Sequence, residues 1–162
     1  MAHELAAALQ QASRIRQRCA LKKSYVHVRG EYIHVAEGRI SEAEAAPFGG
    51  SAWVLANPIS EDMKAMRPSL LPGLLAAARR NLARGAEGVK LFEVGRRYLG
   101  DTEHPTVGIV LAGADPRDWR GGRRGFDAYD AKAEAMAVLA AAGAPVDNLQ
   151  VMGDASAVYH PG

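Results

Sequence analysis

The chain has 162 residues, of which 48% are hydrophobic, and its formal net charge is +2. This length fits one globular domain, and no apolar run approaches the roughly 20 residues that span a bilayer, so a membrane-spanning protein is excluded. The single cysteine, Cys19, excludes an internal disulfide framework and makes a cytoplasmic setting the expectation.

Arginines supply most of the positive charge and gather in clusters. Guanidinium groups match phosphate oxygens, so a nucleic-acid contact is one interpretation. A solvated, solubilising surface is the other, and it is favoured because aromatic residues for base stacking are few and scattered. The arginines concerned are Arg79, Arg80, Arg84, Arg96, Arg97, Arg117, Arg120, Arg123 and Arg124.

The first part of the chain predicts a helix over residues 4–21, where Ala, Leu, Gln and Arg predominate. Two β-prone runs follow at residues 25–28 and 32–35, and the Arg-Gly-Glu sequence between them predicts a hairpin. His27 and His34 raise the alternative of a metal site. Their spacing matches no standard ligand pattern, which favours ordinary strand histidines.

Residues 41–58 predict loops around one short strand. An acidic segment at residues 42–45 leads into a turn or loop at residues 47–50, which contain Pro and Gly. Residues 53–55 are the expected strand. Asn57-Pro58 ends it, because proline restricts the residue before it to extended geometry.

The clearest helix is predicted over residues 70–84. Ser69 is the expected N-cap, Pro72 fits the first turn, and Gly85 supplies a left-handed residue after the C-terminus. An apolar stripe runs along this helix and must be buried, either against the chain's own sheet or partly against another subunit. The stripe consists of Leu71, Leu74, Leu75, Ala78 and Leu82.

Two strands are predicted at residues 89–98 and 107–111, joined by a turn that starts at Gly100-Asp101. Such a short connection favours antiparallel neighbours. A loop over residues 113–125 precedes a helix that Asp130 is expected to cap and that runs through Ala142 to Gly143. Residues 149–152 predict one more short strand.

Several motifs occur in a fixed order from about residue 40 to residue 162. Residues 57–60 read Asn-Pro-Ile-Ser, residues 66–75 Met-Arg-Pro-Ser-Leu-Leu-Pro-Gly-Leu-Leu, and residues 91–95 Leu-Phe-Glu-Val-Gly. Asn81, Phe-Asp-Ala-Tyr-Asp-Ala-Lys at 126–132 and His-Pro-Gly at 160–162 complete the set. The set resembles the catalytic-like module of the bacterial phenylalanyl-tRNA synthetase β subunit. Ordered motifs are far more specific than any one short motif.

The resemblance implies an α+β fold, in which an antiparallel sheet is flanked by helices as in class II aminoacyl-tRNA synthetases. It divides the chain into residues 1–39, a helix plus a hairpin that do not match the family, and residues 40–162, a truncated catalytic-like module. Both parts are expected to belong to one globular domain.

The same resemblance implies that catalytic chemistry is absent. In class II enzymes an arginine that contacts the ATP α-phosphate follows a strand similar to residues 92–101, and Leu99 stands at its position. Leucine offers neither charge nor hydrogen bonds. Arg97 shares a strand face with Leu99 but is displaced by about 6.6 Å, which disfavours a rescue. Glu93 could serve as a general acid or base, but the resemblance favours a structural carboxylate.

The implied function is that of a non-catalytic module of a phenylalanine-tRNA ligase. It would pair with the catalytic α subunit in an αβ heterotetramer and support ATP-dependent charging of tRNA with phenylalanine. The chain alone is then inactive and holds no cofactor, since ATP and magnesium would bind to the α subunit. The expected interface and structural residues are Asn57, Pro58, Arg67, Pro68, Ser69, Leu70, Leu71, Leu74 and Leu75, in the place of the class II dimerisation motif; the synthetase-like strand contributes Phe92, Glu93, Gly95 and Leu99.

Two other functions stay open. A free-standing synthetase paralogue would bind a small molecule or an adenylate, which Leu99 disfavours. An RNA-binding module would use the arginines of the loop at residues 113–125. Other catalytic classes lack support, because the sequence contains no Walker-type, dinucleotide-binding, serine-hydrolase or zinc-protease motif.

Overall fold

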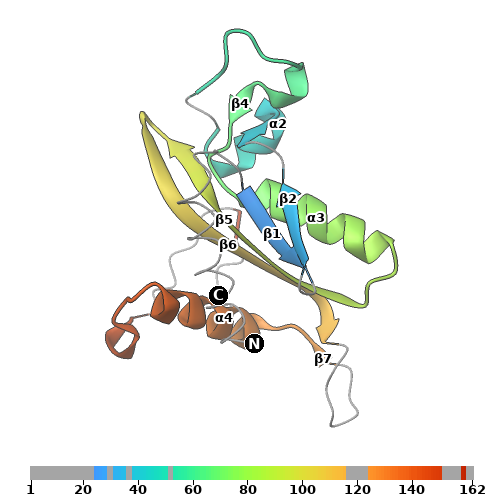
Figure 1. Cartoon of the computed structure of the whole chain (residues 1–162), viewed down its shortest axis with the longest axis vertical. Coiled ribbons are helices and arrows are strands. Elements are labelled where there is room, and N and C mark those ends of the chain that lie inside the picture. The colour runs from blue at the N-terminus through green and yellow to red at the C-terminus, as the bar shows by residue number, and fades with distance from the viewer. Residues whose placement is uncertain are drawn as a thin grey trace.

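Figure 1 shows the computed structural model of the chain, which describes residues 24–28, 31–35, 38–50, 53–115, 124–150 and 158–159. The predicted helix over residues 4–21 lies outside these residues. The strands are β1 (Ser24–Val28), β2 (Glu31–Val35), β3 (Arg39–Ile40), β4 (Ala65–Met66), β5 (Gly88–Leu99), β6 (Thr102–Asp115) and β7 (Arg124–Gly125); the α-helices are α2 (Glu42–Ala45), α3 (Leu71–Ala83) and α4 (Ala128–Ala141); the short 3-10 helices are η1 (Ala46–Phe48), η2 (Glu61–Met63) and η3 (Val146–Asn148).

The strands form two antiparallel sheets. One sheet has five strands in the order β2-β1-β5-β6-β7, and the other consists of β3 and β4. The small sheet, with α2 beside it, lies near the turn of the β5–β6 hairpin (Figure 1). The predicted α+β class with an antiparallel sheet and helices is therefore confirmed.

The β5–β6 hairpin runs through the middle of the large sheet. Its pairing is continuous from Gly88 opposite Gly113 to Leu99 opposite Thr102. Gly100 has a φ of 56°, a left-handed conformation that glycine adopts readily, so the predicted turn and the antiparallel pairing are confirmed.

β6 extends beyond the predicted residues 107–111 at both ends. Pro105 near its start hid this length, because proline is depleted in strands. Pro105 is tolerated because β7, the outer neighbour of β6 in the described sheet, pairs only at Ala114 and Asp115 and leaves the edge at Pro105 uncovered.

The predicted hairpin at residues 25–35 is confirmed as β1 and β2. In its register His27 lies opposite Tyr32 and His34 opposite Tyr25, so the two histidines are not cross-strand partners. β1 also pairs with β5 at Tyr25↔Val94 and Val26↔Glu93, which makes this hairpin part of the large sheet.

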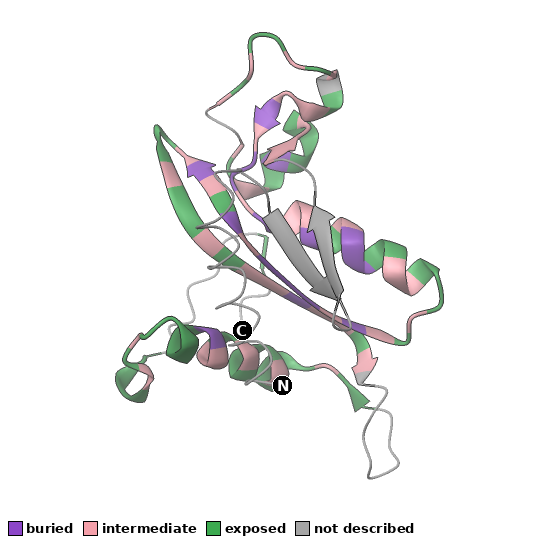
Figure 2. Cartoon of the chain, viewed as in Figure 1, coloured by how far each residue is buried: buried purple, intermediate pink, exposed green. Residues whose placement is uncertain are grey.

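α3 packs on one face of the sheet and forms the core of the molecule with it. Purple, buried segments lie along α3 and β5 in Figure 2. Gly108 permits the close approach, because a Cβ there would lie 2.8 Å from Leu74 Cδ1 and 3.1 Å from Leu70 Cβ. The buried core residues are Leu70, Leu74, Ala77, Ala78, Val89, Leu91 and Val110.

Both ends of α3 follow the sequence signals. The helix begins at Leu71, one residue later than predicted, and Leu70 occupies the N-cap position without a capping side chain. The prediction of Ser69 as the N-cap was therefore wrong, although the Ser69 hydroxyl accepts a hydrogen bond from the Leu71 N–H at 3.2 Å. At the other end, Gly85 donates to the Leu82 carbonyl and Ala86 to the Asn81 carbonyl, the pattern of a Schellman motif.

α4 packs on the opposite face and begins earlier than predicted. Lys90, a neighbour of the core residue Leu91 on β5, points to this face, where its Nζ lies 3.6 Å from Glu134. Asp127, not Asp130, is the N-cap, so that prediction was wrong. The two aspartates form a capping box: Asp127 accepts from the Asp130 N–H, and Asp130 accepts from the Asp127 N–H.

Four smaller predictions need correction. Residues 42–45 form the helix α2, whose capping box joins Ser41 to Glu44. At residues 53–55 the structure has only an isolated bridge between Val54 and Ala65, not a strand. Parts of the predicted loop at 113–125 belong to β6 and β7, and of the strand expected at 149–152, residues 149–150 are not strand and the other two lie outside the described residues.

Candidate functional site

Arg67 and Glu93 form a buried ion pair between β5 and the segment that precedes α3. Arg67 Nη1 lies 2.6 Å from Glu93 Oε1, and the exposed fractions of the two residues are 4% and 0%. Arg67 Nε also donates to the Arg96 carbonyl at 3.0 Å. One guanidinium thus binds a carboxylate and a backbone oxygen of the same strand.

The backbone of Arg67 joins further segments at the same point. Its N–H donates to the Gly38 carbonyl at 3.0 Å, and its carbonyl accepts from the Tyr98 N–H at 2.9 Å. Arg67 therefore links the start of β3, the end of β4 and the edge of β5 that β1 leaves free.

This arrangement encloses the Glu93 carboxylate within the described structure. Its Oε2 is buried and has no hydrogen-bond partner within the described part of the chain. A general acid or base must come within hydrogen-bond reach of a substrate, and a fully enclosed carboxylate does not. Burial of a carboxylate is tolerated when a cation pairs with it, and Arg67 supplies that cation.

Leu99 lies at the last pair of the hairpin, beside a turn that aromatic side chains cover. Trp53 Nε1 donates to the Gly100 carbonyl at 2.6 Å, and the rings of Trp53 and Tyr98 have their centroids 5.3 Å apart. Burial raises the pKa of Tyr98, and the negative charge of Glu103 raises it further. The turn is thus held by an indole from the small-sheet region.

Arg97 shares the strand face of Glu93 and Leu99 and lies opposite His104. Its Nε is buried and has no hydrogen-bond acceptor within the described residues. His104 Nε2 lies 2.8 Å from the Thr102 hydroxyl. This end of the hairpin face is polar, in contrast to the apolar end beneath α3.

The structure separates the expected interface residues into enclosed and accessible ones. Arg67, Pro68, Leu70 and Leu74 are buried within the chain, and Pro58, Ser69 and Leu71 are partly buried. Asn57 and Leu75 are exposed, the latter to 45%. Phe92, Glu93 and Gly95 are buried in β5, and Leu99 is partly buried.

Sequence reasoning missed two features of this region. Ile59, inside the Asn-Pro-Ile-Ser motif, is 78% exposed, more than any other large aliphatic side chain among the described residues. The contact of Arg67 with Glu93 joins residues 26 apart in sequence. The available signal was chemical: a charged residue inside an apolar strand needs an opposite charge.

The arginine clusters also divide. Arg96 pairs with Glu103, and Arg124 binds Asp127 and Asp130, each at 2.7 Å. The hydrogen bond from Arg124 lowers the pKa of Asp130 to about 2. Among the remaining described arginines of the clusters, two are exposed on α3 and one is exposed at its C-cap, whereas Arg117, Arg120 and Arg123 lie outside the described residues.

The described residues contain neither a metal-binding cluster nor a membrane-spanning helix. Within them, no three His, Cys, Asp or Glu side chains are grouped so that they could hold a metal ion, and Cys19 lies outside them. No helix in the described part of the chain has both the length and the apolar character to cross a membrane.

Comparison with known proteins adds a family to this geometry. Residues 36–162 match the family model described as phenylalanyl tRNA synthetase beta chain CLM domain. The chain is 60% identical over 125 residues to the phenylalanine-tRNA ligase beta subunit of Zymomonas mobilis, covering 76% of the chain and 16% of that relative. For the subunits of Novosphingobium aromaticivorans and Rhodospirillum rubrum the identities are 57% and 47%, over 83% and 86% of the chain and 18% of each relative.

These matches define the class as that of aminoacyl-tRNA synthetase domains. The chain belongs to the phenylalanyl tRNA synthetase beta chain CLM domain family. It spans less than a fifth of the length of the curated relatives it matches. The alignments that cover 83% and 86% of the chain are longer than residues 40–162, so the similarity extends N-terminally of residue 40.

Proposed function

We propose that this chain is a non-catalytic core module of a phenylalanine-tRNA ligase β subunit. It pairs with the catalytic α subunit in an αβ heterotetramer and so supports ATP-dependent charging of tRNA with phenylalanine. The observation that carries the proposal is the Arg67–Glu93 pair, because the carboxylate of the synthetase-like strand is wholly enclosed and serves the fold. The relatives, which are named as β subunits of this ligase, support the choice of enzyme.

A class II-like fold without an ATP site is part of the same proposal. Leu99 stands where the resemblance places a phosphate-binding arginine, and Trp53 covers the adjoining turn by its bond to Gly100. ATP and magnesium would therefore bind to the α subunit, in the cytoplasm where tRNA is charged. tRNA would reach this module only within the assembled enzyme.

The α subunit is proposed to contact the accessible residues of the motif region. Asn57, Ile59 and Leu75 are exposed, and burial of Ile59 against a partner would remove a large apolar side chain from water. The enclosed residues Arg67 and Leu74 act from inside, because they hold the linker and α3 in place behind this surface.

The test is light scattering on a size-exclusion column, with the chain alone and mixed with the cognate α subunit. We expect a joint peak at micromolar concentration, which Ile59→Asp separates into two. Tyr129→Asp is the matched control, since Tyr129 is 81% exposed but lies on α4, and its joint peak should persist. Separate peaks for the unsubstituted chain, or equal effects of the two variants, would count against the pairing.

The alternative of a paralogue that binds an adenylate has one observation in its favour. Arg97 Nε is buried without a described acceptor on the face that carries Leu99, so it has a hydrogen bond to give. Titration calorimetry of the chain with ATP and with phenylalanine separates the two functions. Our proposal predicts no heat of binding; binding that Arg97→Gln abolishes would establish the paralogue instead.

A further inference from the structure

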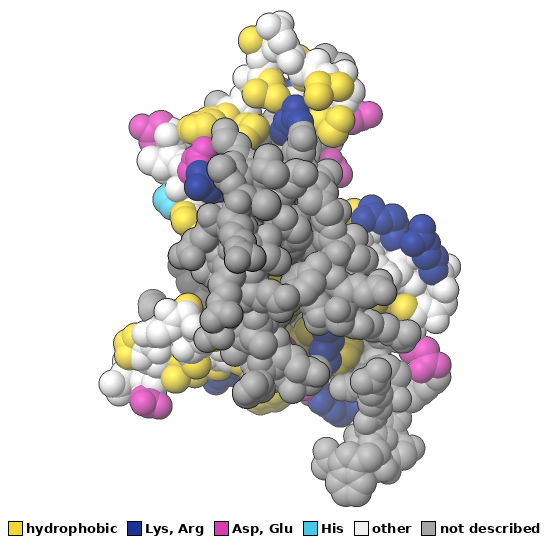
Figure 3. Space-filling view, viewed as in Figure 1, with side chains coloured by type: hydrophobic (Ala, Val, Ile, Leu, Met, Phe, Trp, Pro, Cys, Tyr) yellow, Lys and Arg dark blue, Asp and Glu magenta, His cyan; other side chains and the backbone are white. Residues whose placement is uncertain are grey.

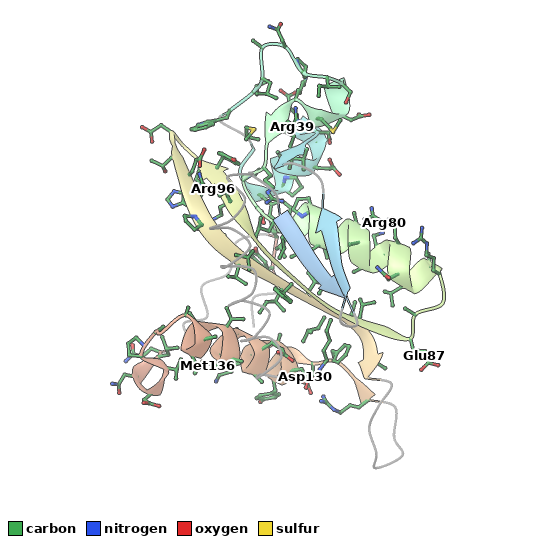
Figure 4. The ribbon with its side chains drawn as sticks, viewed as in Figure 1. Arg39, Arg80, Glu87, Arg96, Asp130 and Met136 are labelled. Atoms are coloured by element: carbon green, nitrogen blue, oxygen red, sulfur yellow. The ribbon has the colours of Figure 1, made fainter. Side chains whose placement is uncertain are left out.

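The outer surface of α3 carries two exposed arginines, Arg79 and Arg80, and a third, Arg84, is exposed at its C-cap; we call these three the arginine face. Figure 3 shows dark blue side chains in a row along α3, and Figure 4 shows Arg80 on the helix. At 100° per residue Arg79 and Arg80 lie away from the buried side of the helix, on which Leu74, Ala77 and Ala78 face the sheet. Arg84 follows Ala77 by seven residues and is exposed because it stands past the end of the helix.

The charge of the arginine face is not balanced within the described structure. Residues 63–86 contain no Asp or Glu, and none of the three arginines forms an ion pair with a described carboxylate. Arg96 and Arg124, by contrast, each have an acidic partner. Like charges four residues apart, as at Arg80 and Arg84, repel each other, and the negative end of the helix dipole offsets this only in the last turn.

The chemistry of the face favours phosphate over a protein surface. Small residues, Ala76 and Ala83, occupy the positions between the arginines of this face. The nearest exposed large apolar side chain is that of Leu75, at one edge of the face. Protein interfaces usually have an apolar or aromatic centre, which is missing here. Guanidinium groups bind phosphate oxygens through paired hydrogen bonds, and α3 has no aromatic residue to stack on a base.

We propose that the arginine face binds the phosphate backbone of RNA, without reading its sequence. The proposed function enters only in the choice of tRNA as the probe, because the relatives are tRNA ligase subunits. This surface is on α3, whereas the RNA-binding alternative considered from the sequence used the loop at residues 113–125.

The experiment measures binding of a fluorescent tRNA transcript to the full chain by anisotropy, over a series of salt concentrations. One variant, Arg79→Gln with Arg80→Gln, removes two charges from the face. The matched control, Arg96→Gln with Lys132→Gln, removes two exposed positive charges elsewhere. Each lost phosphate contact reduces the magnitude of the slope of log affinity against log salt by about 0.7 to 0.9, so the α3 variant should reduce it by about 1.4 to 1.8.

The control should leave the slope within about 0.5 of the unsubstituted chain, less than one phosphate contact. Equal losses in the two variants would overturn the proposal, since they would indicate attraction to total charge. No loss in the α3 variant, or no binding of tRNA by the chain, would also overturn it. Co-elution with the α subunit is measured on the same variants. If the α3 variant no longer pairs but still binds tRNA, the arginine face is a protein interface and the proposal is refuted. The proposed pairing with the α subunit fails independently if the unsubstituted chain does not co-elute with that subunit.

Discussion

At the residue scale, Arg67 is the point where three segments of the chain meet out of contact with water. Its side chain binds Glu93 and the Arg96 carbonyl, and its backbone binds Gly38 and Tyr98. Removal of one member of a buried pair is costly, because the other charge then stays in a medium that solvates it poorly. The pair is therefore a determinant of native geometry whose loss has a measurable energy.

Arg67→Met should lower the free energy of unfolding by about 3 to 5 kcal/mol, since Glu93 would keep a buried, uncompensated charge. Urea denaturation followed by circular dichroism measures the change. Replacement of both charges, Arg67→Met with Glu93→Leu, should recover part of the loss. Arg96→Gln, which breaks the exposed pair with Glu103, should cost at most about 1 kcal/mol. Equal costs for the buried and the exposed pair would contradict the account.

Gly108 is the second position where one residue decides the geometry. An added methyl group would lie 2.8 Å from Leu74 Cδ1 and 3.1 Å from Leu70 Cβ, so the Leu74 side chain would have to turn and α3 would have to shift slightly. Gly108→Ala should destabilise the fold by about 1 to 3 kcal/mol, the usual cost of overpacking. Gly125→Ala is the control, because its nearest neighbour is the Gly113 carbonyl oxygen at 3.8 Å. A neutral Gly108→Ala in thermal unfolding would show that α3 does not approach β6 so closely.

At the element scale, α3 has one buried side, and its neighbouring leucines separate packing from exposure. Leu74 is 0% exposed and Leu75 is 45% exposed. Leu74→Ala should cost about 2 to 5 kcal/mol, and Leu75→Ala should stay within about 0.5 kcal/mol. Chemical denaturation of the two variants measures the difference. The result would also show why Leu74 is unsuitable for probing a subunit interface, since its loss would act on the fold; similar costs would refute the assigned helix orientation.

The start of α4 is predicted to respond to acid. The folded-state pKa of Asp130 is about 2, below its ordinary value of 3.8, because Arg124 and the Asp127 N–H bind its charged form. A lowered pKa of an aspartate stabilises the folded state at any pH above the ordinary pKa of that group. This contribution to the free energy of unfolding is lost as the pH falls from about 4 to about 2. The free energies of unfolding of the unsubstituted chain and of Asp130→Asn, measured by urea denaturation, should differ at pH 6 and converge near pH 2. A difference that grows toward pH 2 would have the wrong sign.

Elements with local signals could be predicted from the sequence, and those without them could not. Ser69, Pro72 and Gly85 mark α3 within one residue at each end, because capping chemistry acts locally. The capping boxes of α2 and α4 were equally visible, but a pair of aspartates three apart does not itself show which one is the cap. The first part of β6 could not be recognised, since only its pairing with β5 makes Pro105 part of a strand.

The candidate site shows the same division. The motifs singled out Arg67 and Glu93 separately, and the resemblance favoured a structural carboxylate at Glu93, which the structure buries beside Arg67. Arg67 was assigned to a subunit interface, but it is buried inside the chain; what brings it to Glu93 is the long-range pairing of its backbone with Tyr98. The exposure of Ile59 likewise depends on tertiary packing and has no local signal.

At the scale of the whole molecule, the two proposed contacts use different surfaces. The accessible motif residues Asn57 and Ile59 precede β4, whereas the arginine face lies on the outer side of α3. Between them the Arg67–Glu93 pair joins the small sheet to the hairpin. We therefore propose that this pair maintains the fold and that the exposed surfaces contact partner molecules.

Aminoacylation by a reconstituted ligase tests this assignment most directly, with Glu93→Gln placed in the full-length β subunit that carries this module. Glutamine keeps the shape of the side chain but cannot act as a base. If Glu93 is structural, an enzyme that still assembles with the α subunit should charge tRNA with phenylalanine at an unchanged kcat per assembled complex. A normally assembled complex whose kcat falls 100-fold or more, the range of about 10² to 10⁴ that general acid–base catalysis contributes, would contradict the account.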